Sequence, residues 1–193
     1  MKTSTKLVAA IMLIASVTLT NKTRAQSTTT MDPNPFRFGI GVETGIPTGT
    51  INKNSKWYLG GTARLQYNTT ANLGITLTSG YYNFFGKNIE SADVKTGIKS
   101  KSFGIVPVKA GIKGFISQNI YLSGEVGAAF ETKNLGDYDG RIGQNPKNTK
   151  LIASPGIGWA NKSWDVGARY ENFSGQSYNY GTIGLRVAYG FGI

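Results

Sequence analysis

Apolar residues alternate with small or charged residues along most of the chain. The alternation first appears after Pro35, where Phe36, Phe38, Ile40, Val42 and Ile46 are separated by Arg37, Gly39, Gly41, Glu43 and Gly45. A period of two is typical of a strand whose two faces meet different surroundings. Residues 36–46 are therefore predicted to form a strand with one apolar and one polar face.

The same pattern recurs and predicts about eight antiparallel strands in all. Five further copies are regular, at residues 57–67, 73–81, 120–131, 164–171 and 183–193. Two more, at residues 103–116 and 151–159, contain Pro107 and Pro155, and proline cannot donate a hydrogen bond within a sheet. A seven-strand or ten-strand alternative is left open at these two prolines.

The two proline-containing segments also break the alternation. Phe103 and Ile105 have the opposite parity to Val106, so a β-bulge at Pro107 is expected to reconcile the two halves of that strand. In the other segment, Ile152 falls on the wrong face for an apolar residue.

The connections between these segments differ in length in a regular way. Short ones, at residues 68–70, 117–119 and 161–163, alternate with longer polar ones at residues 47–56, 84–101, 132–149 and 174–179. Short turns at one rim and long loops at the other are typical of an up-and-down antiparallel barrel that spans a membrane. The sequence therefore predicts an all-β transmembrane barrel over residues 35–193.

A soluble ligand-binding barrel also alternates, so the position of the aromatic residues along each strand is the better guide. Most lie toward segment ends: Trp57, Tyr67, Tyr81, Phe103, Phe130, Trp159, Trp164, Tyr170, Tyr189 and Phe191. Segment centres hold aliphatic residues such as Ile75, Val126 and Leu185. Two aromatic girdles around an aliphatic band favour a lipid-facing surface. Phe36, Phe38 and Ile193 are expected at the periplasmic rim.

The opposite face of the strands carries the charges, which are expected to point into the lumen. They are Arg37, Glu43, Arg64, Lys109, Lys113, Glu125, Asp165, Arg169, Glu171 and Arg186. We expect an ion-pair network in which Arg169 and Arg186 meet Asp165 and Glu171, and Lys109 and Lys113 meet Glu125. The interior of an eight-stranded barrel is only just wide enough to be filled by side chains. A structural lumen is favoured, and a narrow path for ions or small solutes is the alternative.

The N-terminal residues indicate export. Lys2 and Lys6 precede an apolar run over residues 7–19, and a polar stretch ends at Ala25. A basic start, a short apolar core and a small residue at the cleavage position are the features of a secretory signal peptide. We expect residues 1–25 to be cleaved and residues 26–34 to form a short linker before the barrel.

The composition excludes several function classes. The chain has no cysteine and no histidine, which removes disulfides, thiolate and imidazole metal sites, and histidine-dependent nucleophiles. No cofactor, metal or catalytic residue is expected. Residues 137–140 resemble a fragment of a calcium-binding loop, but the distal glutamate of such a loop is missing. No nucleic-acid module accompanies the net charge of +11, which falls to +7 without residues 1–25.

Basic residues in the connections are expected to attract lipid phosphates or sugars such as those of lipopolysaccharide. They are Lys53, Lys56, Lys87, Lys95, Lys99, Lys101, Lys133, Arg141, Lys147 and Lys150. Plain solvation of charged loops is the alternative.

The chain resembles the small outer-membrane β-barrel family, which includes OmpA-type and OmpX-like barrels and the porin-like barrel domains of Bacteroidetes. The resemblance rests on the export junction at residues 24–26 and on the ending at residues 184–193, with Phe191 two residues before the terminal Ile193. It implies a monomer in the bacterial outer membrane, recognised by the barrel-assembly machinery. It also implies a role in adhesion, surface protection or envelope integrity. Enzymes of this family rely on histidine, so catalysis is not expected.

Overall fold

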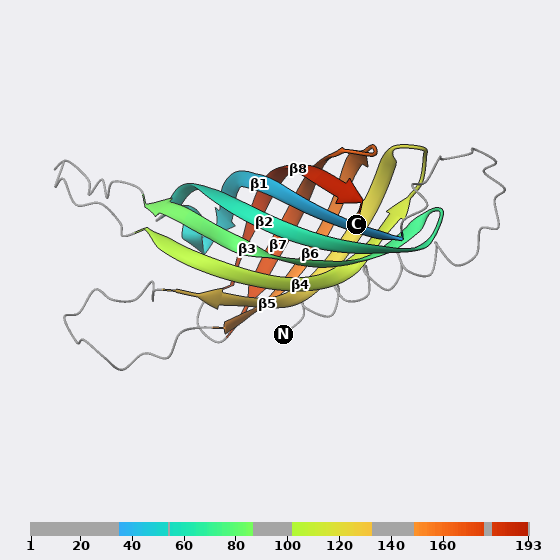
Figure 1. The fold of residues 1–193 in the computed structure, drawn as a ribbon. Coiled ribbons are helices and arrows are strands. Elements are labelled where there is room, and N and C mark those ends of the chain that lie inside the picture. Colours follow the sequence, from blue (N-terminus) through green and yellow to red (C-terminus); the bar gives the residue numbers. More distant parts are fainter. Residues whose placement is uncertain (1–34, 54, 87–101, 133–148, 176–178, 193) are drawn as a thin grey trace, which may run out of the picture.

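The computed structural model describes residues 35–53, 55–86, 102–132, 149–175 and 179–192, and its strands close into a barrel (Figure 1). The strands are β1 (Phe36–Gly49), β2 (Ser55–Thr70), β3 (Leu73–Gly86), β4 (Phe103–Phe115), β5 (Ile120–Glu131), β6 (Thr149–Ala160), β7 (Trp164–Ser174) and β8 (Tyr180–Gly192). Each pairs antiparallel with the next, and β1 pairs with β8. The predicted eight-stranded up-and-down barrel is confirmed.

The register is continuous through both prolines. In β4, Pro107 lies opposite Ala129 of β5 with no shift on either side, and in β6, Pro155 lies opposite Gly124 in the same way. The bulge expected at Pro107 is therefore wrong. Proline interrupts the pairing with one neighbouring strand only, since the β3–β4 pairs skip from Ser79–Val108 to Tyr82–Ile105. The strand keeps its alternation across that gap.

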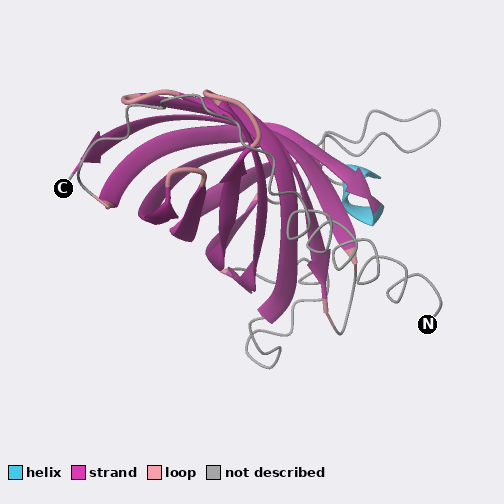
Figure 2. Ribbon diagram, turned by 90° about the vertical axis from the view of Figure 1, so that its right-hand side faces the viewer, coloured by secondary structure: helices cyan, strands magenta, loops and turns pink. Residues whose placement is uncertain are grey.

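The two ends of the barrel differ. The connections at residues 71–72, 116–119 and 161–163 are short and define the turn end, while those at residues 50–54, 87–102, 132–148 and 175–179 define the loop end. The first of the loop-end connections is shorter than expected, because β1 and β2 extend to Gly49 and Ser55 around a 3₁₀ helix, η1 (Thr50–Lys53). It is the only helix in the described residues (Figure 2). No helix there is long and apolar enough to cross a membrane.

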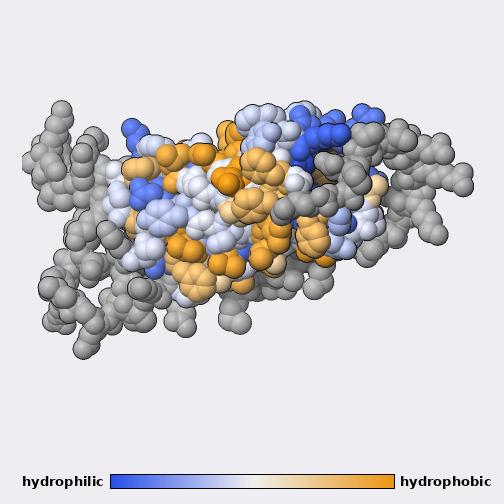
Figure 3. Space-filling view, viewed as in Figure 1, coloured by the Kyte–Doolittle hydropathy of each residue, from blue (hydrophilic) through white to orange (hydrophobic). Residues whose placement is uncertain are grey.

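The barrel is apolar outside and charged inside. Ile40, Val42 and Leu185 are between 57% and 58% exposed, whereas Lys109 and Arg186 are at most 2% exposed. Hydrophobic side chains are spread over the wall, and the most hydrophilic ones gather mainly toward its ends (Figure 3). A soluble ligand-binding barrel has the reverse arrangement, with its apolar face inward. The described surface therefore contradicts that alternative.

A cluster of large apolar residues nevertheless points inward in the half nearer the loop end. Phe103 and Ile105 share the parity of Lys109, and Ile152 shares that of Ser154, so all three lie inside. Phe103 is 4% exposed, and its expected place in the outer girdle is wrong. With inward residues of other strands they form what we call the loop-end cluster: Ile51, Tyr58, Tyr82, Phe84, Phe103, Ile105, Ala129, Ile152, Phe173 and Tyr180.

Candidate functional site: the filled barrel interior

A closed ring of alternating charges occupies the middle of the lumen. We call it the ion-pair ring, and its members in order are Glu43, Arg169, Glu125, Arg64, Asp165 and Arg186. The six consecutive N···O distances, from Glu43–Arg169 round to Arg186–Glu43, are 2.9, 3.3, 3.0, 3.7, 3.7 and 3.4 Å. Its side chains come from inward-facing positions of β1, β2, β5, β7 and β8. The ring thus links strands that are far apart in the sequence.

Three more charges are attached to this ring. The Lys109 ammonium lies 3.4 Å from Glu125 and also donates a hydrogen bond to Glu171, while Lys113 donates to Asp165 at 2.7 Å. All three side chains are at most 1% exposed. Buried charges are tolerated only when they are paired and hydrogen-bonded, so these contacts are what makes a charged interior compatible with folding.

Hydroxyl groups donate further hydrogen bonds to three of these carboxylates. Thr78 donates to Glu125 at 2.7 Å, Tyr82 donates to Glu43 at 2.8 Å, and Tyr121 donates to Asp165 at 2.6 Å. The Tyr121 ring fits because Gly158 faces it, and a Cβ at that glycine would overlap the ring. These bonds fix the carboxylates in place, so the network is an ordered structure.

The loop-end cluster is built from stacked rings. Phe84 stacks on Phe103 with centroids 4.7 Å apart and on Tyr58 at 5.0 Å, and Phe173 stacks on Tyr180 at 4.7 Å. Stacked aromatic pairs contribute about 0.5–1.5 kcal/mol each beyond the apolar area that they bury. Phe84, Tyr58 and Phe173 are fully buried. The cluster therefore fills the lumen on the loop side of the ion-pair ring.

One further pair of charges lies beside this cluster. Lys150 is 2% exposed, lies 3.9 Å from Glu131 and stands over the Tyr180 ring at 5.6 Å. Tyr180 also donates a hydrogen bond to Glu131 at 3.1 Å. The expectation that Lys150 belongs to an exposed basic rim is wrong, because its position in β6 has inward parity.

A small, partly open cavity lies at the turn end of the lumen. Arg37, Arg64, Gln66, Asp165 and Arg186 line it, together with the small residues Gly39, Ala188 and Gly190 and with Tyr189. Its position follows from the strand ends, since Arg37 stands near the start of β1 and Gly190 near the end of β8.

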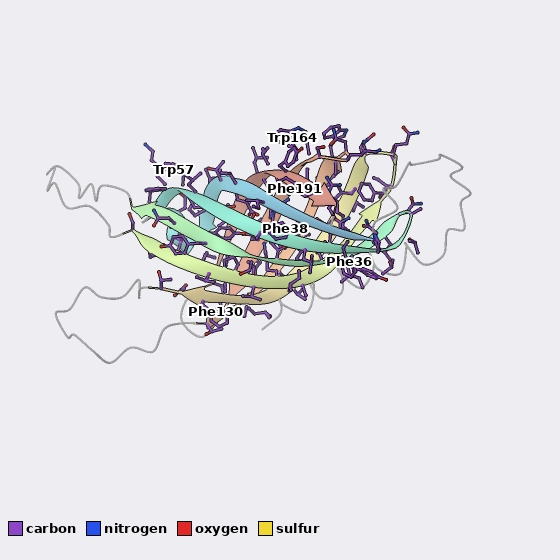
Figure 4. All side chains as sticks on the ribbon, viewed as in Figure 1. Phe36, Phe38, Trp57, Phe130, Trp164 and Phe191 are labelled. Carbon is purple, nitrogen blue, oxygen red and sulfur yellow. The ribbon has the colours of Figure 1, made fainter. Side chains whose placement is uncertain are left out.

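The outer aromatic residues lie on both sides of the aliphatic band. Trp57 and Phe130 lie toward the loop end, and Phe36, Trp164 and Phe191 lie toward the turn end (Figure 4). The residues expected at a lipid interface are all between 39% and 49% exposed: Trp57, Tyr67, Tyr81, Trp159, Trp164, Tyr170, Tyr189 and Phe191. The outer surface thus presents amphipathic rings near strand ends and aliphatic side chains between them.

Comparison with solved structures identifies the architecture. Ail, the attachment invasion locus protein of Yersinia pestis, matches with a TM-score of 0.53 at 19% identity, over 82% of this chain and 99% of that one. The N-terminal β-barrel domain of Pseudomonas aeruginosa OprF matches with a TM-score of 0.52 at 13% identity, over 79% and 97%. Neisserial surface protein A matches with a TM-score of 0.50 at 14% identity, over 82% and 97%.

The chain has the fold of the small outer-membrane β-barrels. By sequence alone it matches no family model and no curated protein. The likeness is therefore one of fold, and the contacts inside the barrel are those of this chain's own residues.

The ion pairs in the lumen differ in detail from those expected. Lys109 meets Glu125, Arg169 meets Glu171 and Arg186 meets Asp165, as expected. Lys113 instead lies next to Asp165, because its strand position is nearer the turn end than Glu125. No partner was predicted for Glu43, which contacts both Arg169 and Arg186.

Other expectations lie outside the described residues. They concern the signal peptide and linker at residues 1–34, the calcium-like fragment at residues 137–140, Ile193, and most of the basic loop residues, among them Lys87, Lys95, Lys99, Lys101, Lys133, Arg141 and Lys147. Within the described part of the chain, no group of three or more acidic residues could hold a metal ion.

Proposed function

We propose that the protein is a non-conducting, non-catalytic barrel of the bacterial outer membrane that anchors surface loops for interaction with anionic groups. In this orientation the turn end faces the periplasm and the loop end faces the outside, as is usual for such barrels. The observation that carries the proposal is the filled lumen. A lumen filled by ordered side chains favours a structural role over a path for ions or solutes.

Two successive layers support the non-conducting role. An ion that enters from the turn end would first meet the ion-pair ring, whose Glu43 and Glu125 side chains are at most 3% exposed. It would then meet the loop-end cluster, where Phe84 and Ile105 are fully buried. Passage would require breaking buried ion pairs and also displacing stacked rings, each of which costs several kcal/mol, about 3 or more.

Planar-bilayer recordings test this role. Refolded protein is expected to give no discrete conductance steps, because both layers stay closed at ordinary voltages. Heat-modifiable gel migration checks folding, and flotation of liposomes made from the same preparation checks insertion. Reproducible steps from folded, inserted protein would favour the alternative of a narrow channel.

The sequence of the loop-end connections supports the surface role. Residues 87–102 contain four lysines and two acidic residues, and Lys56 is exposed at the start of β2. Lysine side chains attract phosphate and sulfate groups as point charges. Ail has also been solved in complex with the heparin analogue sucrose octasulfate, and that structure matches this chain with a TM-score of 0.52 at 20% identity. We carry over to this chain only the chemical class, a densely anionic sugar or lipid headgroup.

Neutralising two of these lysines tests the surface role. Lys99→Gln with Lys101→Gln is expected to weaken association with lipopolysaccharide vesicles, with the effect shrinking as salt is raised because screening removes it. Lys162→Gln, which removes an exposed cation at the turn end, is the control and should leave binding unchanged. Equal binding by the wild type and the double variant at low salt would contradict the role of these lysines.

A further inference from the structure

The non-polar band on the outer wall of the barrel is not equally tall on every strand. Every second residue of a strand faces outward, so the run of outward non-polar residues sets the local height of the band. In β5 this run has six members, from Ile120 to Phe130, and in β6 it has five, from Leu151 to Trp159. The run in β7 has four members: Trp164, Val166, Ala168 and Tyr170. The band is therefore shorter on β7 than on these neighbours.

Polar residues bound the band of β7 on both sides. The polar turn at residues 161–163 comes directly before it, and the next two outward positions after it are Asn172 and Ser174. The Ser174 hydroxyl donates a hydrogen bond to Oδ1 of Asn172 at 2.7 Å, so both side chains lie on the outer face. Within the described part of β7, no non-polar outward residue follows them. Outward polar residues in the bands of β1 and β3 differ, because a non-polar outward residue follows each toward the loop end: Thr44, Ser79 and Asn83.

The difference between β5 and β7 corresponds to about 10 Å of membrane thickness. A strand that rises about 3.3 Å per residue and is tilted by about 40° advances about 2.5 Å per residue along the membrane normal. From residue 120 to residue 130 the band of β5 is thus about 25 Å tall, as is usual for outer-membrane barrels. From residue 164 to residue 170 the band of β7 is about 15 Å tall.

Tilting of the whole barrel does not remove this mismatch. A tilt moves both edges of the band on one side in the same direction, so the band of β7 keeps its height. In a hydrocarbon layer of uniform thickness, Asn172 and Ser174 would lie among acyl chains. Acyl chains offer no hydrogen-bond partner to the Asn172 amide, and such burial of a polar group is unfavourable. A layer that is thinner beside β7 avoids this cost.

We propose that β7 is a site of local membrane thinning. Water and lipid headgroups reach the level of Asn172 there, whereas acyl chains cover the matching level on β5. The surface of β7 therefore fits lipids with short acyl chains better than lipids with long ones. The inference goes beyond the anchoring role, and it holds whichever end of the barrel faces the outside, because it concerns the height of the band.

Spin labels at two matched positions test the thinning. Asn172 is the fifth outward position of β7 from the turn end, and Ala128 is the fifth of β5. The chain has no cysteine, so Asn172→Cys and Ala128→Cys each carry one label. In vesicles of dioleoylphosphatidylcholine, a water-soluble nickel complex should collide several times more often with the label at position 172. The labelled β7 keeps four non-polar outward positions and Ser174, so its band stays short.

Equal exclusion of the nickel complex from both positions would overturn the thinning and leave the transmembrane barrel intact. Equal and ready access to both would overturn the thinning and the membrane-spanning barrel together.

Extending the band gives a second measurement. Asn172→Leu with Ser174→Leu gives β7 six outward non-polar positions, as in β5. The ratio of the wild-type unfolding rate to that of this double variant should rise as dilauroyl lipids are replaced by dioleoyl lipids, because the taller band fits the thicker layer. Ala128→Leu is the control, since it adds non-polar surface inside a band that is already full, and its ratio should stay constant. A ratio for the double variant that does not change with chain length would overturn the proposal.

Discussion

Replacing Glu125 by glutamine is expected to lower the free energy of unfolding by about 3–5 kcal/mol. The carboxylate contacts Arg64 at 3.0 Å, Arg169 at 3.3 Å and Lys109 at 3.4 Å. The amide keeps the size of the side chain but removes the negative charge, which leaves three buried cations with less compensation. Urea unfolding in micelles or vesicles, followed by tryptophan fluorescence, measures the change.

A double-mutant cycle with Lys109→Met separates loss of the network from a local packing defect. Lys109→Met alone also destabilises the protein, because it removes the hydrogen bond to Glu171. Combining it with Glu125→Gln removes one charge of each sign, so the double variant should be more stable than the sum of the two single effects by about 1 kcal/mol or more. Strictly additive effects would show that the two residues do not act within one network.

Leu185→Arg is expected to cost about 2–4 kcal/mol, because the new charge would sit near the middle of a hydrocarbon layer. Leu185 is 58% exposed at the centre of β8, and its neighbour Arg186 is buried. On the surface of a water-soluble protein the same exchange would have little effect. The free energy of unfolding from lipid vesicles measures this cost.

Leu73→Arg is the matched control for depth. Leu73 is 40% exposed and begins β3 at the turn end, so an arginine there reaches the interface and should cost only about 0–1 kcal/mol. Ala188→Ser, inside the lumen and two residues beyond Arg186, should also be mild. Equal costs for the two leucine exchanges would argue against a hydrocarbon belt around the barrel.

Most of the fold could be predicted because a strand has a period of two. In β2, β5 and β8 every apolar residue that the alternation places outward is outward, and the charges between them are inside. The predicted bulge was wrong because proline was taken as a break in the strand. Pro107 lacks one hydrogen-bond donor, but the pairing of Ile105 and Lys109 with β5 on either side of it is in one register.

The loop-end cluster was missed for a different physical reason. A membrane barrel was expected to be polar throughout its interior, so Ile152 and Ile105 looked misplaced and Phe103 was put on the outside. Counting every second residue from Lys109 and from Ser154 would have placed all three side chains inside the barrel. The contacts across the barrel, such as Arg169 with Glu43, depend on how the barrel closes and on how far neighbouring strands are shifted along one another. That shift sets the level of each side chain along the barrel axis, and it cannot be read from the alternation within one strand.

A depth profile along the outer face of β8 tests the central claim, that apolar residues face lipid and charges fill the interior. The chain has no cysteine, so single exchanges at Ile183, Leu185, Val187, Tyr189 and Phe191 can each carry one spin label. All five side chains are between 40% and 58% exposed, so a label fits without repacking the lumen. Measured in vesicles, accessibility to oxygen relative to a water-soluble nickel complex should be highest near Leu185 and should fall toward Phe191. A flat profile, with the nickel complex reaching Leu185 as readily as Phe191, would contradict the claim.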